Sequence, residues 1–336
     1  MMNEARPLLS RVADSVYWMA RYIERAENIA RYIGVNLNLQ LDLPLDPASQ
    51  WQPLIDTSGD GKLFRERFGK ASQESVIEFL AFDAENPNSI YSCLRYAREN
   101  ARSVRETISS EMWEQVNRMY LRIHEHHSMP EPEQLLDTFS NMRLGCHLFQ
   151  GITDATMTHN EAWHFVRLGR KLERADKTSR ILDVKYFMLL PSAEDVGTPY
   201  DDIHWSAVLK SVSGFEMYRK KYGKILPRDI VDFLVMDREF PRSIHFCIRR
   251  ADESLHAITG TPTGSYAYRC EQLMGRIRSE MDFTSVDRVI HDGLHEYLDA
   301  VQLKLNAIDA ALASDFVAWQ RQSQTQSQTQ HAESGR

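Results

Sequence analysis

Two short Glu-Arg stretches hold the residues whose types and spacing best fit chemistry on a charged group. In the first, Arg21, Glu24, Arg25 and Asn28 are three or four positions apart, so a helix would carry all four on one face. Guanidinium forks bind carboxylates and phosphates, whereas a glutamate between two arginines has a lowered pKa and makes a poor general acid or base near neutral pH. The spacing therefore predicts binding rather than catalysis, and no catalytic residue is assigned.

The second stretch repeats this arrangement with Arg170, Glu173, Arg174 and Lys177. It lies in a basic segment, because residues 163–180 hold six Lys or Arg side chains and only two acidic ones. A basic helix in an acidic protein is suited to a carboxylate, a phosphate or an acidic partner segment. Three interpretations stay open: ion pairs that join two parts of the fold, an anion or partner site, and a plain solvated surface.

Both stretches belong to predicted helices. Around the first, apolar residues recur at steps of three and four, which predicts a helix that begins near Ser10 and ends before Pro44. Its stripe consists of Val12, Val16, Met19, Ile23, Ala26, Ala30, Ile33 and Leu37, and the second helix carries Phe165, Leu168, Leu172, Ala175 and Leu182. Tyr17 and Tyr32 lie on the Glu-Arg side, so the first helix should be buried on both sides. Strand-like alternation is scarce, and the fold class predicted is all-α.

An internal duplication organises the chain. The segment Val76–Glu99 aligns without a gap to Ile230–Glu253, with 11 identical residues of 24 at a constant offset of 154. At an offset of 149, Glu24-Arg25-Ala26 falls on Glu173-Arg174-Ala175. Two copies are too few for a solenoid, so we expect a helical bundle built from two pseudo-symmetric diverged repeats.

The duplication predicts the domain organisation and specific pairs of positions. One helical repeat is assigned to residues 1–156 and the other to 157–319, while the polar, low-complexity residues 320–336 should form a disordered tail. Asp83 should superpose on Asp237, and Trp51 on Trp205.

Composition and charge argue against several classes of protein. The formal net charge is −7, so non-specific nucleic-acid binding is not expected. No apolar run approaches the roughly 20 residues that span a bilayer, and the amino-terminal residues lack the apolar core of a secretory signal. Cys93, Cys146, Cys247 and Cys270 form no C-x-x-C pair and are expected to be reduced core residues. These features predict a cytoplasmic protein with no membrane contact.

Weaker motifs add no chemistry. His291 and His295 have the spacing of two zinc ligands on one helix face, but Asp292 stands where a zinc protease has its glutamate, and Gly293 weakens the helix. The segment Ser58–Lys62 only faintly resembles a phosphate-binding loop. We therefore expect no metal site and no cofactor.

The strings SRVADSVYWMARYIERAENIARYI, FDAENPNSIYSCLRYARENARSVRE and FVRLGRKLERADKTSRILDVKY occur in this order, and with them the chain resembles the alpha-E family from about Leu9 to Ile308. This family is a helical group named for a Glu-Arg motif, a domain of unknown function associated with circularly permuted ATP-grasp proteins. The resemblance assigns the motif to Glu24-Arg25 and, by the duplication, to Glu173-Arg174. It provides no catalytic residue to carry over.

The resemblance also implies partners. Members of the alpha-E family are typically encoded beside, or fused to, circularly permuted ATP-grasp proteins and transglutaminase-like peptidases. The resemblance therefore implies a role in peptide ligation or tagging. The first hypothesis is a non-catalytic partner of an ATP-grasp carboxylate–amine ligase. Alternatives are an enzyme that acts on a carboxylate or peptide at the Glu-Arg cleft, and a purely structural scaffold.

Overall fold

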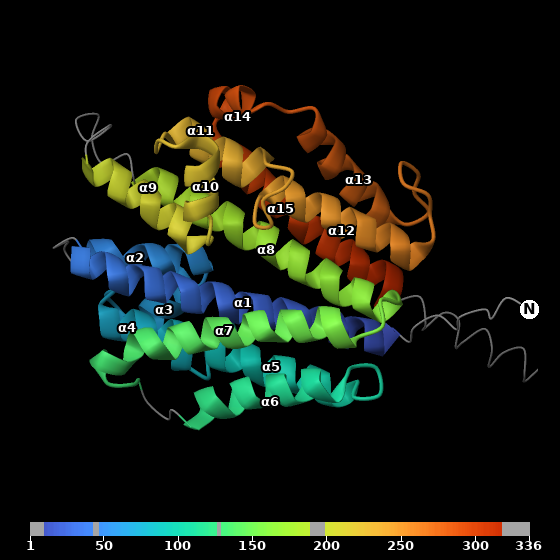
Figure 1. Ribbon diagram of the computed structural model, residues 1–336, viewed down its shortest axis with the longest axis horizontal. Helices are drawn as coiled ribbons and strands as arrows, with labels where there is room; N and C mark the ends of the chain where they lie inside the picture. The colour runs from blue at the N-terminus through green and yellow to red at the C-terminus, as the bar shows by residue number, and fades with distance from the viewer. Residues whose placement is uncertain (1–9, 43–46, 126–128, 189–198, 318–336) are drawn as a thin grey trace, which may run out of the picture.

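The computed structural model describes residues 10–42, 47–125, 129–188 and 199–317, and within these ranges every regular element is helical (Figure 1). Fifteen α-helices and three π-helical turns occur in this part of the chain, with no strand. The all-α prediction is confirmed. The predicted tail at 320–336 lies outside the described residues.

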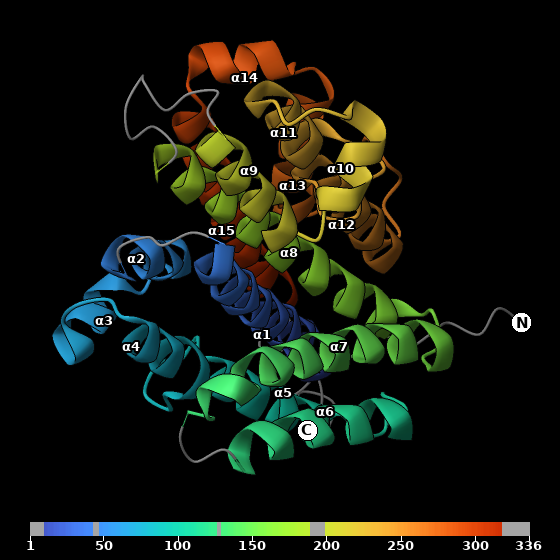
Figure 2. The same ribbon diagram turned by 60° about the vertical axis from the view of Figure 1, so that its left-hand side comes forward.

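Two long helices form the centre of the molecule: α1 (Ser10–Asp42) and α8 (Glu161–Met188). They pack against each other and run in the same direction, since Tyr17 lies beside Gly169 and the Tyr32 hydroxyl donates to the carbonyl of Lys177. The two helices approach each other closely at Gly169, because a Cβ atom there would lie 2.5 Å from the Tyr17 carbonyl oxygen. Figures 1 and 2 show α1 and α8 between two groups of surrounding helices.

The group that follows α1 covers it with α5 and α7, and α6 packs on both of these helices. Its elements are α2 (Pro47–Ser58), α3 (Gly61–Phe68), α4 (Gln73–Ile77), the π-turn η1 (Glu78–Phe82), α5 (Ile90–Ser103), α6 (Ser110–Glu125) and α7 (Pro132–Thr156).

The group that follows α8 covers it with α12 and α15, and α13 packs on both of these. Its elements are α9 (Pro199–Ser211), α10 (Phe215–Tyr222), α11 (Pro227–Val231), the π-turn η2 (Asp232–Met236), α12 (Ile244–Thr259), α13 (Arg269–Asp282), α14 (Val286–Asp292), α15 (Leu294–Leu312) and η3 (Ala313–Val317).

Element bounds in the two groups follow the offset seen in the sequence. The elements α3, α4 and η1 begin and end 154 residues before α10, α11 and η2. Asp83 and Asp237 follow the two π-turns, and each accepts a hydrogen bond from the backbone two residues on, at 2.9 Å and 2.8 Å. Each is also paired with a basic side chain sixteen residues earlier, Arg67 or Lys221. Asp83 and Asp237 therefore have similar environments, with the same backbone hydrogen bond and an ion pair from the same relative position.

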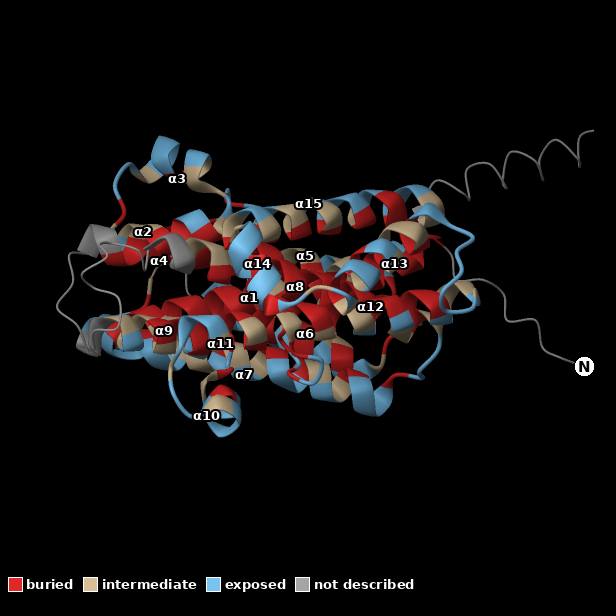
Figure 3. Cartoon of the chain, turned by 90° about the horizontal axis from the view of Figure 1, so that it is seen from above, coloured by how far each residue is buried: buried red, intermediate tan, exposed pale blue. Residues whose placement is uncertain are grey.

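One hydrophobic core serves both groups. A single cluster of buried side chains contains Ile23 of α1, Leu172 of α8, and both Trp51 and Trp205. Figure 3 shows buried residues along α1, α8 and α12, while the outer elements such as α3, α10 and α14 are largely exposed. The core places α1 and α8 in apolar surroundings on more than one side, so polar groups between them must find partners within the chain.

Candidate functional site

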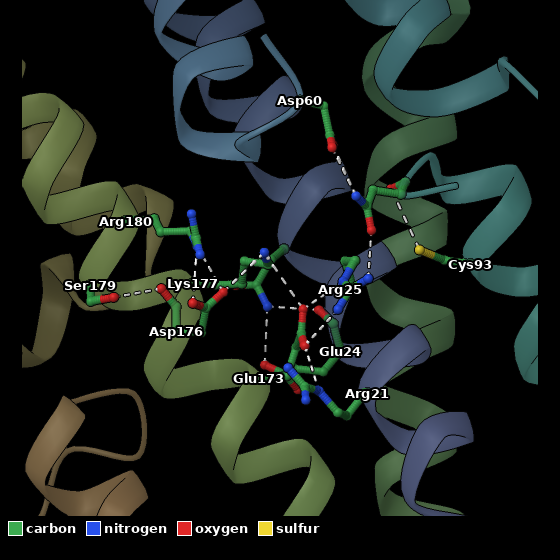
Figure 4. Close-up of polar contacts among 12 residues, drawn as sticks. Arg21, Glu24, Arg25, Asp60, Cys93, Glu173, Asp176, Lys177, Ser179 and Arg180 are labelled. Carbon is green, nitrogen blue, oxygen red and sulfur yellow. Dashed lines mark hydrogen bonds and ion pairs between the residues drawn. The ribbon is translucent and has the colours of Figure 1, made fainter. Parts of the chain in front are cut away.

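Both Glu-Arg pairs meet where α1 packs on α8 (Figure 4). Glu24 of α1 accepts two hydrogen bonds from Arg174 of α8, from Nε at 2.7 Å and from Nη2 at 2.8 Å. Glu173 of α8 accepts two from Arg25 of α1, from Nε at 2.7 Å and from Nη2 at 3.0 Å. Each helix thus gives one glutamate and one arginine to the other, and both contacts are bidentate, the strong form of a charge-assisted hydrogen bond.

Further basic side chains surround each carboxylate. Arg21 donates from Nε to Glu173 at 2.8 Å and also pairs with Asp309 of α15. Arg242, in the loop before α12, donates to Glu24 at 3.1 Å and to Glu27 at 3.0 Å. Glu24 and Glu173 are therefore each held by at least two guanidinium groups. We name these pairs, with Arg21 and Arg242, the Glu-Arg cluster.

The remaining predicted residue of the first helix, Asn28, also belongs to this region. Its amide donates to the Glu24 carbonyl at 2.7 Å and to the Glu24 carboxylate at 3.3 Å. Asn88 accepts from Arg25 at 2.6 Å and stands 154 residues before Arg242. These two loop positions are thus equivalent: Asn88 contacts the cluster with its amide in the group that follows α1, and Arg242 contacts it with a guanidinium in the group that follows α8.

Burial and charge together set the state of the two glutamates. Glu24 is 1% exposed and Glu173 is 0% exposed. Burial by itself would raise the pKa of Glu24, but the guanidinium groups of Arg174 and Arg242 outweigh it and hold that pKa far below its ordinary value. For Glu173, Arg25 and Arg21 likewise outweigh burial and lower the pKa. Both carboxylates stay ionised near neutral pH and do not act there as general acids.

The chain supplies carboxylates of its own to several basic side chains of α8. Arg174 forms an ion pair with Glu24, and Lys177 lies 3.2 Å from Asp176 and 3.7 Å from Glu173. Arg170 lies 3.8 Å from Asp154. Counting charges along one helix overstated the basic character of this segment, since Glu24 and Asp154, which face its arginines, stand on α1 and α7.

Arg170 and Lys177 keep a small exposed fraction, 13% and 12% of their side chains, and Arg25 keeps 15%. These three side chains form the accessible edge of the cluster. Among the eight predicted binding residues, the structure brings Arg21, Glu24, Arg25, Glu173 and Arg174 into direct contact, with Asn28 and Lys177 attached to them and Arg170 at the margin. Whether any of them binds a ligand stays a prediction.

The spacing of His291 and His295 does not produce a two-histidine helix face. His291 is in α14 and His295 is in α15, because Gly293 between them has φ +104° and separates the helices. His295 Nδ1 lies 2.7 Å from Asp183. Within the described ranges no three His, Cys, Asp or Glu side chains are grouped to hold a metal ion.

Other expectations concern the cysteines and the membrane. Cys93, Cys146, Cys247 and Cys270 are all buried and unpaired, in agreement with their prediction as core residues. Burial raises the pKa of the Cys93 thiol to about 12, so this thiol is not an activated nucleophile. None of the described helices has the length and hydropathy needed to cross a bilayer.

Comparison with known proteins agrees with the helical architecture and with the presence of a Glu-Arg motif. Residues 8–317 match the model of the Alpha-E family, which is described as a predicted alpha-helical domain with a conserved ER motif. The chain belongs to the Alpha-E family. The Glu-Arg dipeptides at the α1–α8 contact are those that the sequence assigned to this motif.

Similar sequences include uncharacterized proteins of Mycobacterium bovis and Mycobacterium tuberculosis, each 24% identical over 314 residues. The match covers 86% of this chain and 34% of each relative, so the chain spans about a third of the length of these curated relatives. No solved structure matches the chain significantly.

Proposed function

We propose that this chain is a non-catalytic helical partner in a peptide-ligating or peptide-tagging system, in which an ATP-grasp protein performs the carboxylate–amine ligation. A transglutaminase-like peptidase is a second expected partner. The observation that carries the proposal is the state of Glu24 and Glu173: each is buried, ionised and hydrogen-bonded to at least two arginines. Such groups hold helices in place and do not transfer protons near neutral pH, which favours a binding or positioning role over catalysis.

We further propose that the chain consists of two copies of one helical unit joined at α1 and α8. Supporting this are the 154-residue offset of the sequence and of the element bounds, together with the exchange of Glu and Arg between the two helices. Each copy supplies half of the cluster. The cluster then fixes how the two copies are oriented and so shapes the surface presented to a partner.

Contact with an acidic partner segment is proposed at the accessible edge of the cluster, formed by Arg25, Arg170 and Lys177. Arg170 is the least tightly paired of these, because its ion pair with Asp154 spans 3.8 Å, whereas Arg25 and Lys177 lie 2.7 Å and 3.2 Å from their carboxylates. We also propose that the protein works in the cytoplasm, since four buried and unpaired cysteines suit a reducing compartment.

The test is titration of the purified chain into a circularly permuted ATP-grasp protein from the same organism, at low and at high salt. We expect binding that weakens as salt rises, no ATP turnover by the chain alone, and weaker binding by Arg170→Gln. Arg122→Gln, an exposed change on α6, is the control and should bind as the unchanged chain does. Thermal unfolding of each variant separates lost binding from lost fold. ATP turnover by the isolated chain would overturn the proposal, and salt-insensitive binding would move the interface elsewhere.

A second candidate function, an enzyme acting on a carboxylate or peptide, is favoured by one observation away from the cluster. A cavity of about 430 Å³ between α12 and α13 is lined by Asp252, His256 and Arg278, among others. Burial raises the pKa of Asp252 even though Arg278 opposes it, and Oδ1 of Asp252 lies 3.5 Å from His256 Nε2. An aspartate with a raised pKa beside a histidine is a combination used in acid–base chemistry. Hydrolysis of a peptide library by the chain, abolished by Asp252→Asn, would establish this candidate instead.

A further inference from the structure

Four arginines follow one another along α5 at spacings of three and four residues. Arg95, Arg98 and Arg102 lie in α5, and Arg105 lies in the turn that follows this helix. The spacing places them along one face, where like charges three or four positions apart destabilise a helix. Figures 1 and 2 show α5 and α6 on the side of α1 that faces away from α8. We name these four residues the arginine stripe.

The charge of the arginine stripe is only partly neutralised by the chain. Glu99 lies 3.1 Å from Arg98 and 3.7 Å from Arg102, and no other carboxylate of the described ranges pairs with the stripe. Arg95 and Arg105 therefore form no ion pair with a described residue. Four guanidinium groups share one carboxylate, which leaves an excess of three positive charges on this face. An acidic partner would complement it.

Three arginines of the stripe lie over aromatic rings of α5 and α6. The distances from Cζ to the ring centroid are 5.8 Å for Arg95 to Tyr91, 4.9 Å for Arg95 to Tyr96, 4.9 Å for Arg98 to Tyr120, 5.8 Å for Arg98 to Trp113 and 4.8 Å for Arg105 to Trp113. A guanidinium group over a ring uses its flat face and leaves the N–H groups of its edge free for carboxylate oxygens. Side chains held in this way lose little conformational freedom when a partner binds.

The corresponding helix of the other group lacks the stripe. The residues 154 positions later are Arg249, Asp252, His256 and Thr259, so only one arginine remains. This helix, α12, packs on α8 as α5 packs on α1, and its Asp252 accepts a hydrogen bond from Arg278 of α13 at 2.7 Å. A helix in this position packs without four arginines, so packing does not account for the stripe.

The rings beside the stripe indicate which kind of acidic partner fits. Surfaces that bind single-stranded nucleic acid offer aromatic faces on which bases stack. Here His124 stacks on Tyr120 and on Tyr91, with ring centroids 5.3 Å and 6.0 Å apart, and Arg95 and Arg98 lie over the same two tyrosines. The formal net charge of −7 also opposes binding of a polyanion. Tyr, Trp and Arg are, by contrast, the residues that contribute most to protein–protein contacts.

We propose that the arginine stripe and the rings beside it bind an acidic segment of a partner protein. Carboxylates of that segment accept hydrogen bonds from the guanidinium edges, above all from Arg95 and Arg105, which pair with no carboxylate of the described ranges. The surface lies on α5 and α6 and is separate from the accessible edge of the Glu-Arg cluster, which lies on α1 and α8. It stands whether or not the partnership with an ATP-grasp protein is correct, and the purified chain alone suffices to test it.

The experiment follows the fluorescence anisotropy of labelled decaglutamate as the whole chain is added, with decaglutamine and an oligothymidylate of the same length as comparisons. We expect decaglutamate to bind with an affinity that falls as salt rises, and decaglutamine to bind at least about tenfold more weakly. The oligothymidylate should also bind more weakly than decaglutamate. Equal or tighter binding of the oligothymidylate would overturn the assignment to a protein segment, and absence of decaglutamate binding at low salt would overturn the surface itself.

Two double variants locate the binding within the chain. Arg95→Gln combined with Arg105→Gln should weaken decaglutamate binding at least about tenfold. The matched control combines Arg249→Gln, at a half-buried position 154 residues after Arg95, with Arg219→Gln, at an exposed arginine that lies over one aromatic ring as Arg105 does. The control removes the same charge and should bind within about twofold of the unchanged chain. Equal losses in the two double variants would show a general attraction to positive charge and would contradict the proposal.

The contribution of the rings is tested without a change of charge. Trp113→Leu removes the ring beside Arg98 and Arg105 and should weaken decaglutamate binding about threefold. Thermal unfolding of each variant separates lost binding from lost fold, and the two arginine substitutions, which break no ion pair of the described ranges, should leave the unfolding temperature nearly unchanged. Full affinity in the Arg95→Gln, Arg105→Gln double variant would overturn the proposal whatever Trp113→Leu does.

Discussion

Removing the charge of Glu24 is the perturbation that the structure describes most completely. The Glu24 carboxylate accepts hydrogen bonds from Arg174 at 2.7 Å and 2.8 Å, from Arg242 at 3.1 Å and from Gln150 at 3.1 Å, with its side chain 0% exposed. Glu24→Gln keeps the shape but leaves two buried guanidinium groups facing a neutral amide. Breaking a buried pair in this way costs about 3–5 kcal/mol, and we expect Glu24→Gln to lower the free energy of unfolding by that amount.

The chain offers a matched control at its surface. Glu66 lies 4.0 Å from Lys62 on α3, and their side chains are 60% and 87% exposed. Exposed pairs of this spacing contribute about 0.3–0.5 kcal/mol, so Glu66→Gln should change stability by no more than that. Urea unfolding followed by circular dichroism measures both variants under the same conditions. A loss in Glu24→Gln as small as that in Glu66→Gln would refute the reasoning that the cluster joins α1 to α8.

The difference in unfolding free energy between the unchanged chain and Glu24→Gln should also depend on pH, with a sign that follows from the lowered pKa of Glu24. Because the folded pKa of Glu24 is held below its ordinary value of 4.5, its stabilising contribution is fully present above about pH 4.5 and is lost as the pH falls below that value. The difference in unfolding free energy between the unchanged chain and Glu24→Gln should therefore be constant from pH 8 to about pH 5 and shrink in more acidic buffer. A difference that grew on acidification would contradict the assignment of Glu24 as an ionised carboxylate.

Three further outcomes concern residues of α8 and are read from unfolding experiments. Gly169→Ala should destabilise by about 1–3 kcal/mol despite the better helix propensity of alanine, since its Cβ would meet the Tyr17 carbonyl, whereas Gly151→Ala on α7 meets nothing within 4 Å and should stabilise by up to about 1 kcal/mol. Burial, together with the nearby Arg174, lowers the pKa of Lys171 to about 7. Between pH 7 and pH 10 the unfolded chain therefore binds more protons than the folded chain, and the free energy of unfolding should rise with pH. In Lys171→Met this rise should disappear. Glu173→Gln should be about as destabilising as Glu24→Gln, because Arg25 loses its carboxylate and Arg21 keeps only Asp309.

The helices were the most predictable part of this fold. The apolar stripe of α1 determines which face enters the core, and tyrosines on its second face indicated burial on both sides, which Tyr17 and Tyr32 have. The π-turns η1 and η2 were not predicted, because a shift to i→i+5 hydrogen bonding depends on the tertiary position of Asp83 and Asp237 and leaves no periodicity of its own. Gly169 was an unused signal: a glycine within a long helical pattern often marks close approach of another backbone.

Only part of the candidate site could be predicted from sequence spacing. The spacing identified Glu24, Arg25, Glu173 and Arg174 and left structural ion pairs as one open interpretation. The structure places these residues in ion pairs between α1 and α8. Arg242 was missed, since it arrives from a loop more than two hundred residues after Glu24. Asp309, Glu27 and Arg31 were missed for a related reason. Their place in the charged network depends on how the helices pack, which sequence spacing does not give.

A double-mutant cycle between Glu24 and Arg174 tests the central claim most directly, that this buried pair couples the two halves of the chain. The free energy of unfolding is measured for the unchanged chain, Glu24→Gln, Arg174→Gln and the double variant. Residues in direct contact within one charged network show coupling energies of about 0.5–3 kcal/mol, and a bidentate buried pair should reach the upper part of this range. The account predicts that the double variant is less damaged than the sum of the single variants by about 2 kcal/mol or more. Additive losses, within about 0.5 kcal/mol, would contradict it.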